Sequence, residues 1–271
     1  MDSVGTKSGW DNWKAGRDEA LRDPYGWLSL VDLQWLGEEP RRLDHFPGDW
    51  SAQGNTVLFA PVKGETPVYR DGALVEEPLE IEVGPGVTDR SLRDADGREI
   101  EVMYRYWGPA IRVRDPKARR LAEFRGLDRY DFDPRWVLRG RVLPYEQPME
   151  VTVPTAVEGG TTEIDAWADA EVVLPDGEPL ALQLFGDGPE HSSVSFYDQT
   201  NGKTTPGWRS APVVVDGDTV VIDLNRAQIF PAHLTPFGTC PKPPGENRVP
   251  ARVKAGEKKF AGRETLGSGT K

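Results

Sequence analysis

The chain has 271 residues and a formal net charge of −11, with 44 acidic against 33 basic side chains. This surplus of negative charge repels phosphate backbones and anionic lipid headgroups, so the sequence predicts neither a nucleic-acid-binding nor a membrane-binding protein. The single cysteine, Cys240, excludes an intrachain disulfide and leaves too few thiols for a cysteine-based zinc site. The 9 tryptophans and 9 phenylalanines are typical of a folded globular protein.

Hydropathy and composition predict the location and the domain limits. The first residues lack the basic start and apolar core of a secretory signal, and no run approaches the ~20 apolar residues that a membrane span requires. We therefore expect a cytoplasmic protein. The composition predicts a flexible N-terminus at residues 1–9, one β-rich domain at residues 10–260 with a possible subdivision near residue 145, and a flexible tail at residues 261–271.

The first element expected is a short amphipathic helix over residues 10–22. Trp10, Trp13 and Leu21 are separated by charged residues, so the two tryptophans would pack on another part of the fold. Pro24 ends this helix, because a proline pushes the residue before it out of the helical region. Apolar residues alternate over residues 31–35, which favours a strand, although the leucine spacing leaves a helix open.

The rest of the chain is predicted to be mostly antiparallel β-structure. Short apolar runs are separated by dipeptides that supply the positive φ angles of tight turns. These dipeptides are Asp71-Gly72, Asp96-Gly97, Asp176-Gly177, Asn201-Gly202 and Asp216-Gly217. Strands are expected at residues 56–59, 79–83, 99–107, 110–113, 136–143, 150–153, 163–167, 170–174, 180–185 and 219–224.

The fold class that follows is mainly β: an antiparallel closed or partly closed barrel or sandwich, with an N-terminal helix. Closure hides the edges that so many short strands would otherwise expose. A proline-rich loop over residues 223–247 is expected to cover one end and, because each proline lacks an N–H donor, not to run as a helix. Glycine patterns of the Rossmann and P-loop types do not follow any predicted strand, so no cofactor is predicted.

Three groups of residues resemble a known family. They are Gly26-Trp27-Leu28-Ser29-Leu30 with Trp35-Leu36, then Ile111-Arg112-Val113-Arg114-Asp115-Pro116, and finally Asp223-Leu224-Asn225-Arg226-Ala227 with Thr239-Cys240-Pro241 and Glu246-Asn247-Arg248. From about Trp10 to Phe260, the chain resembles the bacterial and archaeal family known as domain of unknown function 1684. The resemblance implies a mostly β fold and no assigned activity.

The chain departs from this family's pattern at two places. Members usually carry a cysteine where this chain has Ala232, and His233 follows it here. Members also carry a tyrosine after the Asn-Gly pair, whereas the stretch from Thr205 to Arg209 lacks one. The resemblance therefore implies a divergent, specialised member of the family.

Asp223 and Asn225 are the first candidate site residues. Strand alternation places both on the face opposite Val220 and Ile222. In a dry cleft, the Asp223 carboxylate could act as a base and Asn225 could orient a substrate. The alternative is structural, because buried polar pairs usually hold a neighbouring loop by hydrogen bonds.

His233 is the second candidate, since histidine exchanges protons near neutral pH. Glu246 is its candidate acid or base partner. The structural alternatives are a histidine that satisfies a backbone carbonyl and a solvated turn at Glu246. A zinc site made from His233 with the other two histidines is disfavoured by their spacing, so no metal is predicted. Cys240 is expected to be a small packing residue rather than a nucleophile.

The candidate substrate-binding residues are aromatic or basic. Trp27 and Trp208 each follow a glycine in a predicted turn, and we expect them at the mouth of the pocket. Arg209 and Arg226 are expected to receive an anionic or carbonyl group of the ligand, or else to pair with surplus carboxylates.

Together these residues predict a protein that binds a small organic molecule in an aromatic-lined pocket and catalyses redox-neutral acid–base chemistry, such as an elimination, isomerisation, cyclisation or hydrolysis. Asp223, His233 and Glu246 would carry protons, with Asn225 and Arg226 orienting the substrate. A non-catalytic binding protein is the first alternative, and a structural or interaction protein is the second. The oligomeric state is left open.

Overall fold

The computed structural model describes residues 4–262, in two compact units. One unit holds residues 20–124, and the other holds residues 4–19 together with residues 125–262. The sequence predicts one domain with a possible subdivision near residue 145, whereas the divisions in the structure fall at 19/20 and 124/125. Of the ends predicted to be flexible, residues 1–3 and 263–271 lie outside the described residues.

The C-terminal unit contains a closed antiparallel barrel, which confirms the predicted fold class. Its strand order is β14-β13-β12-β11-β16-β15, and a second pairing between β14 and β15 closes the ring. The six strands are β11 (Val137–Pro154), β12 (Thr161–Val173), β13 (Pro179–Phe185), β14 (Ser193–Phe196), β15 (Arg209–Asp216) and β16 (Thr219–Asp223).

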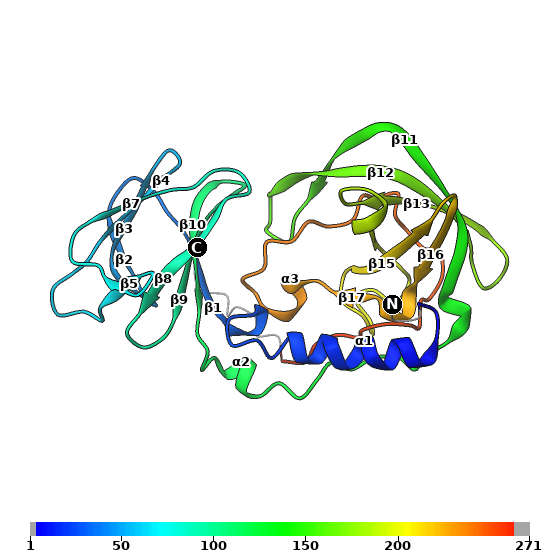
Figure 1. The fold of residues 1–271 in the computed structure, drawn as a ribbon, viewed down its shortest axis with the longest axis horizontal. Helices are drawn as coiled ribbons and strands as arrows, with labels where there is room; N and C mark the ends of the chain where they lie inside the picture. The colour runs from blue at the N-terminus through cyan, green and yellow to red at the C-terminus, as the bar shows by residue number, and fades with distance from the viewer. Residues whose placement is uncertain (1–3, 263–271) are drawn as a thin grey trace. The chain divides into compact units, whose positions relative to one another are not determined.

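Two of these strands are longer than predicted. β11 and β12 each take in two of the short strands expected from the sequence, and they run side by side over most of their length (Figure 1). Their pairing slips between Pro144 and Met149, and the pairing of β12 with β13 slips between Ala166 and Ala168. Such irregularities bend a strand without ending it. The polar interruptions in the sequence are therefore bends rather than turns.

Alternate residues of the barrel strands fill its interior. The inward residues are apolar and at most 7% exposed, as the period of two along a strand requires. They include Leu138, Val142, Ala168, Ala170, Val172, Leu182, Leu184, Val194, Phe196, Ala211, Val213, Val220 and Ile222. Their side chains form one continuous hydrophobic cluster, so the barrel interior is a packed core.

The predicted N-terminal helix is present as α1 (Lys7–Ala20) and packs on the C-terminal part of the chain. Trp10 is 5% exposed, and its indole Nε1 donates to the carbonyl of Asn225 at 3.0 Å. Two turns further along, Arg17 donates to the buried carboxylate of Glu257 at 3.1 Å. The helix is therefore held by its tryptophan face and by an ion pair shielded from water.

Residues 20–124 form the second β unit. One sheet has the order β1 (Leu30–Trp35), β10 (Gly108–Arg114), β9 (Glu99–Arg105), β8 (Thr88–Asp94), β5 (Val68–Arg70) and β6 (Ala73–Leu74). The other has the order β2 (Arg41–Leu43), β3 (Phe46–Gln53), β4 (Thr56–Ala60) and β7 (Leu79–Glu82). Both sheets contribute to one apolar core, which includes Trp50, Phe59, Ile100 and Ile111.

Short helical turns join the strands. In the unit of residues 20–124 these are η1 (Trp27–Ser29) and α2 (Arg119–Ala122), and in the barrel unit they are η2 (Pro134–Trp136), η3 (Pro189–His191), η4 (Leu224–Arg226) and α3 (Pro231–Leu234). No helix within residues 4–262 is long and apolar enough to cross a membrane. The two-residue strand β17 (Gln228–Ile229) precedes α3 and pairs with the start of β15.

The proline-rich loop is present, but it contains a short helix, α3, where the prolines predicted none. Pro231 occupies the first turn of α3. A proline is tolerated there, because the first N–H groups of a helix have no acceptor within the helix. The helix ends after four residues, and the chain then continues without regular structure.

Candidate functional site

Asp223 and Asn225 lie together at the end of β16, as strand alternation predicts, but by a different geometry. The strand ends at Asp223, and Asn225 belongs to the helical turn η4. Both side chains are 0% exposed. The carboxylate of Asp223 accepts from the backbone N–H of Asn225 at 3.1 Å and from its side-chain amide at 3.0 Å. The pair therefore caps η4.

The remaining contacts of this pair are also structural. The second carboxylate oxygen of Asp223 accepts from the backbone N–H of Gly5 at 3.2 Å and lies 3.5 Å from Nε of Arg226. The Asn225 side chain donates to the carbonyl of Asp133 and accepts from the N–H of the same residue, at 3.0 and 2.9 Å. Both oxygens of the Asp223 carboxylate are thus occupied, which favours a positioning role over proton transfer.

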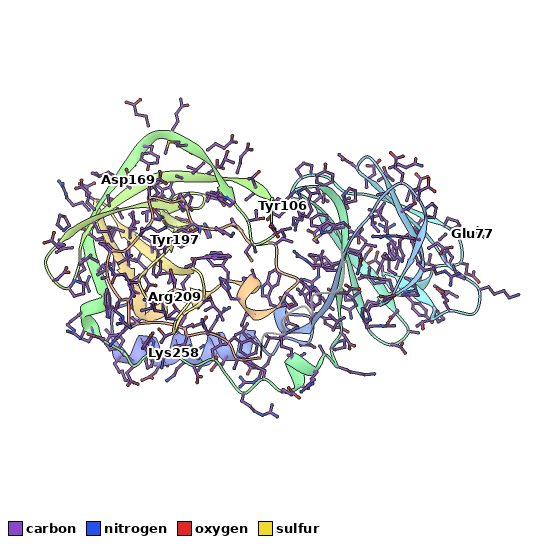
Figure 2. The ribbon with its side chains drawn as sticks, turned by 180° about the vertical axis from the view of Figure 1, so that it is seen from behind. Glu77, Tyr106, Asp169, Tyr197, Arg209 and Lys258 are labelled. Carbon is purple, nitrogen blue, oxygen red and sulfur yellow. The ribbon has the colours of Figure 1, made fainter. Side chains whose placement is uncertain are left out.

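Arg209, which is labelled in Figure 2, is buried, and the terminal nitrogens of its guanidinium donate hydrogen bonds to other groups of the protein. One nitrogen donates to the Asp198 carboxylate at 2.8 Å and to the carbonyl of Val253 at 3.1 Å. The other donates to the carbonyls of Ala255 and Glu257. Burial lowers the pKa of Arg209, while the nearby Asp198 carboxylate acts in the opposite direction. Arg209 therefore holds the C-terminal segment against the barrel, away from any surface that a ligand could reach.

Trp208, directly before β15, and His233, in the predicted loop, form an aromatic cluster. Their ring centroids are 4.2 Å apart in an edge-to-face arrangement, and Phe230 lies 6.1 Å from the Trp208 ring. Lys242 places its ammonium group 5.9 Å from the same ring. Two residues expected at the site, 25 positions apart in the sequence, are thus brought into contact by β17 and α3.

The indole N–H of Trp208 has no acceptor among residues 4–262. The side chain is 7% exposed, so water does not satisfy the donor freely either. Leaving a donor of this kind unsatisfied costs about 1–3 kcal/mol, and such groups in folded proteins call for an explanation. The comparable indole of Trp167 donates to the hydroxyl of Ser192 at 3.1 Å.

Glu246 does not share the burial of Asp223. It is exposed, in the turn that precedes Asn247. Asn247 is 0% exposed, and its side chain donates to the carbonyls of Gln183 and Ser195, both at 2.9 Å. Its oxygen also accepts from the N–H of Gln183 at 2.8 Å. Because β13 and β14 pair at one position only, this amide fills the gap between them.

Trp27 lies in η1, in the unit of residues 20–124. The guanidinium groups of Arg114 and Arg112 lie 5.3 and 5.8 Å from its ring. Arg114 also donates to the Glu101 carboxylate at 2.7 Å. The tryptophan therefore covers a buried ion pair of that unit.

Sequence reasoning missed a polar cluster on the barrel wall. The hydroxyl of Tyr145 donates to the carboxylate of Asp169 at 2.7 Å. Partial burial, followed by this hydrogen bond, raises the pKa of Tyr145 to about 12, while a hydrogen bond with Gln183 acts in the opposite direction. The three residues come from β11, β12 and β13, and no spacing in the sequence connects them.

The described grooves lie elsewhere. One of about 470 Å³ is lined by residues of β11, β12 and β13, including Gly140, Val173 and Leu180. Two others, of about 340 and 300 Å³, adjoin each other in the unit of residues 20–124 and share Pro47, Glu65 and Thr66. None of the three contains a residue predicted for the site. Within residues 4–262, no group of three or more His, Cys, Asp or Glu side chains is arranged to hold a metal ion.

Comparison with known proteins gives a family but no activity. No curated protein matches the chain. Among solved structures, the chain is similar to an uncharacterized protein of Haloarcula marismortui determined by solution NMR, with 28% sequence identity and a TM-score of 0.42. The similarity covers 53% of this chain and 80% of that one.

The model of the family described as "Protein of unknown function (DUF1684)" matches residues 122–258. The match spans the whole barrel together with the segment from Asp223 to Asn247 that holds most of the predicted site. The motif at residues 26–30 lies outside it. Because this model matches more than half of the chain, the chain belongs to the DUF1684 family.

Proposed function

We propose that this protein binds a small organic molecule beside Trp208 and His233, and that His233 transfers a proton to or from it in a redox-neutral reaction. The ligand carries a hydrogen-bond acceptor, such as a carbonyl or carboxylate oxygen. The observation that carries the proposal is the buried indole N–H of Trp208, which lacks an acceptor among residues 4–262.

The neighbours of Trp208 fit such a ligand. Phe230 and the imidazole of His233 supply apolar and aromatic contact area. Lys242 adds a cation close to the same ring, which favours an acceptor with negative charge. A Cβ at Gly207 would lie 3.8 Å from the Cε1 atom of the imidazole, an ordinary contact distance, so the glycine leaves space for about one methyl group beside the ring.

His233 is the member of this cluster that can exchange a proton near neutral pH. It sits in α3, which follows η4 and β17 directly. Because Asp223 and Asn225 fix η4, they support the position of α3 without contacting the ligand. The roles predicted from the sequence for two further residues remain hypotheses: Glu246 would carry a proton, and Arg226 would orient the substrate.

Binding without catalysis is the second candidate. It is favoured by the state of Asp223, whose carboxylate oxygens are both engaged in holding η4 and the N-terminal segment. An enzyme that relied on this carboxylate would have to break those hydrogen bonds. A protein that only holds its ligand would need no such change.

The test follows the indole N–H groups by NMR during addition of small carboxylates, ketones, lactones and esters. The chain has 9 tryptophans, and Trp208→Phe identifies the Trp208 signal by its loss. A ligand at the proposed site shifts this signal and leaves that of Trp167 in place. His233→Gln then separates the two candidates: turnover stops while binding persists if the protein is an enzyme. A ligand that shifts no signal of Trp208, and whose turnover survives both variants, contradicts the proposal.

A further inference from the structure

Part of strand β12 presents an open edge. Residues 161–166 pair with residues 154–149 of β11 on one side. On the other side, pairing with β13 begins only at Ala166. Residues 161–165 therefore belong to a two-stranded ribbon that extends past the end of β13 (Figure 1). The first part of β12 has a partner strand on one side only.

The register fixes which backbone groups face outward. The N–H of Thr155 donates to the carbonyl of Gly160, so this pair is a hydrogen-bonded one. In an antiparallel ladder, hydrogen-bonded and non-hydrogen-bonded pairs alternate. The N–H and C=O groups of Thr161, Glu163 and Asp165 therefore point away from β11. These three residues offer a row of alternating donors and acceptors with the spacing of a peptide strand.

The side chains beside this row are acidic. Side chains on a strand alternate between faces, so Glu163 and Asp165 share one face of the ribbon. Glu150 lies directly opposite Asp165 on the same face. All three are exposed, and none takes part in an ion pair within residues 4–262. Like charges directly opposite each other destabilise a two-stranded ribbon, unless a cation lies between them.

We propose that this edge binds an extended, basic segment of another protein by β-strand addition. The segment would continue the sheet in line with β13, and its backbone would pair with Thr161, Glu163 and Asp165. Its side chains on the acidic face would be lysine or arginine, at every second position. Residues in between would lie beside Thr162 and Ile164, which are half-buried and favour an apolar or small partner.

Two features of the chain identify this class of partner. The overall charge of −11 repels nucleic acid. Nucleic acid also lacks the peptide N–H and C=O groups with which a strand edge pairs. Two strands of the chain carry alternating basic residues and are already paired, β11 at Arg139 and Arg141 with β16 and β10 at Arg112 and Arg114 with β9. Arg252 and Lys254 also alternate, and the carbonyl of Val253 between them accepts from Arg209. These segments of a second copy are therefore engaged within their own fold, which favours a basic segment of another protein as the partner. The inference is independent of the function proposed for Trp208 and His233.

The test uses a short fluorescent peptide, Thr-Lys-Val-Lys-Val-Lys-Thr, and fluorescence anisotropy at low salt. We expect saturable binding to the full chain. Glu163→Lys/Asp165→Lys should weaken it by about tenfold or more, because each complementary contact becomes repulsive. The same variant should bind Thr-Glu-Val-Glu-Val-Glu-Thr instead. A matched control, Glu178→Lys/Asp218→Lys, changes the net charge equally at two turns of the barrel and should bind the basic peptide as the wild type does.

A second comparison separates strand addition from simple charge attraction. The basic peptide is methylated on alternate backbone nitrogens, which removes the donors and leaves the charge. Strand addition predicts that binding is lost. Undiminished binding of the methylated peptide, equal binding to both double variants, or no binding up to about 1 mM peptide would each overturn the proposal.

Discussion

The guanidinium of Arg209 lies 2.8 Å from the carboxylate of Asp198, and both side chains are 0% exposed. Removing one partner of such a pair leaves a buried charge without compensation and costs about 3–5 kcal/mol. We expect Asp198→Asn to lower the free energy of unfolding by about this amount in urea denaturation. The control is Glu171→Gln, whose partner Arg141 is 2.9 Å away but exposed, and which should cost less than about 1 kcal/mol. Equal decreases in the free energy of unfolding for the two variants would show that burial does not strengthen the pair of Arg209 and Asp198.

Trp208 and Trp167 provide a second comparison, because only the latter has an acceptor for its indole N–H within the described chain. Replacement by phenylalanine removes the N–H in both cases. Trp167→Phe loses a hydrogen bond and leaves the Ser192 hydroxyl behind, whereas Trp208→Phe removes an unsatisfied donor. We expect Trp208→Phe to cost about 1 kcal/mol less in free energy of unfolding. The reverse order would mean that the Trp208 donor is satisfied in solution.

The amide of Asn247 bridges β13 and β14 with three hydrogen bonds. Asn247→Ala leaves three partly buried backbone groups without their partner and should cost about 3 kcal/mol. Its exposed neighbour serves as control: Glu246→Ala should change the free energy of unfolding by less than about 0.5 kcal/mol. If Glu246→Ala instead abolished the turnover of a ligand identified by NMR, the catalytic role predicted for Glu246 would gain its first support.

Two glycines should respond to alanine in opposite directions. A Cβ at Gly140 would lie 1.8 Å from the carbonyl oxygen of Glu171 on the neighbouring strand, so Gly140→Ala should cost about 3 kcal/mol or more, or prevent folding. Gly16 lies in α1 with no atom within 4 Å of such a Cβ. Gly16→Ala should therefore stabilise the protein by about 0.5–1 kcal/mol, measured by thermal unfolding.

Tyr145 makes stability depend on pH in the alkaline range. Its pKa is raised from 10.0 to about 12, so the folded protein retains the phenol proton where the unfolded chain loses it. The stability from this group is full below pH 10 and is lost as the pH rises to about 12. Near-ultraviolet absorbance should show fewer tyrosines ionising near pH 10 than in the unfolded chain, since burial also raises the pKa of Tyr197. Tyr145→Phe should remove part of this difference. In Tyr145→Phe, the decline in free energy of unfolding between pH 10 and 12 should be smaller.

The sequence predicted the parts of the fold that depend on neighbouring residues. Gly72, Gly97, Gly177 and Gly217 all have positive φ angles at strand connections, because the tight turns there require them. The segment 30–35 is a strand, and a helix of similar extent to the expected one begins at Lys7. Closure of the barrel was also foreseen, since it removes exposed edges.

The parts that depend on distant residues could not be predicted in this way. The contact between Trp208 and His233 follows from β17 and α3, and the helical turn at Pro231 was not expected from the prolines. The burial of Arg209 depends on Asp198 and on carbonyls more than 40 residues further along the chain. For Asp223 and Asn225, alternation indicated proximity, but only the contacts with Gly5 and Asp133 show how fully the polar groups are used.

The seam between β13 and β14 has a consequence for the order in which the protein is made. All six barrel strands precede residue 224, but the amide that joins β13 to β14 belongs to Asn247. During synthesis, all six strands therefore leave the ribosome before Asn247 does. Until then the growing chain holds an unsealed sheet, exposed to non-native pairing with neighbouring chains. Nascent chains halted before and after residue 247 should differ sharply in resistance to protease.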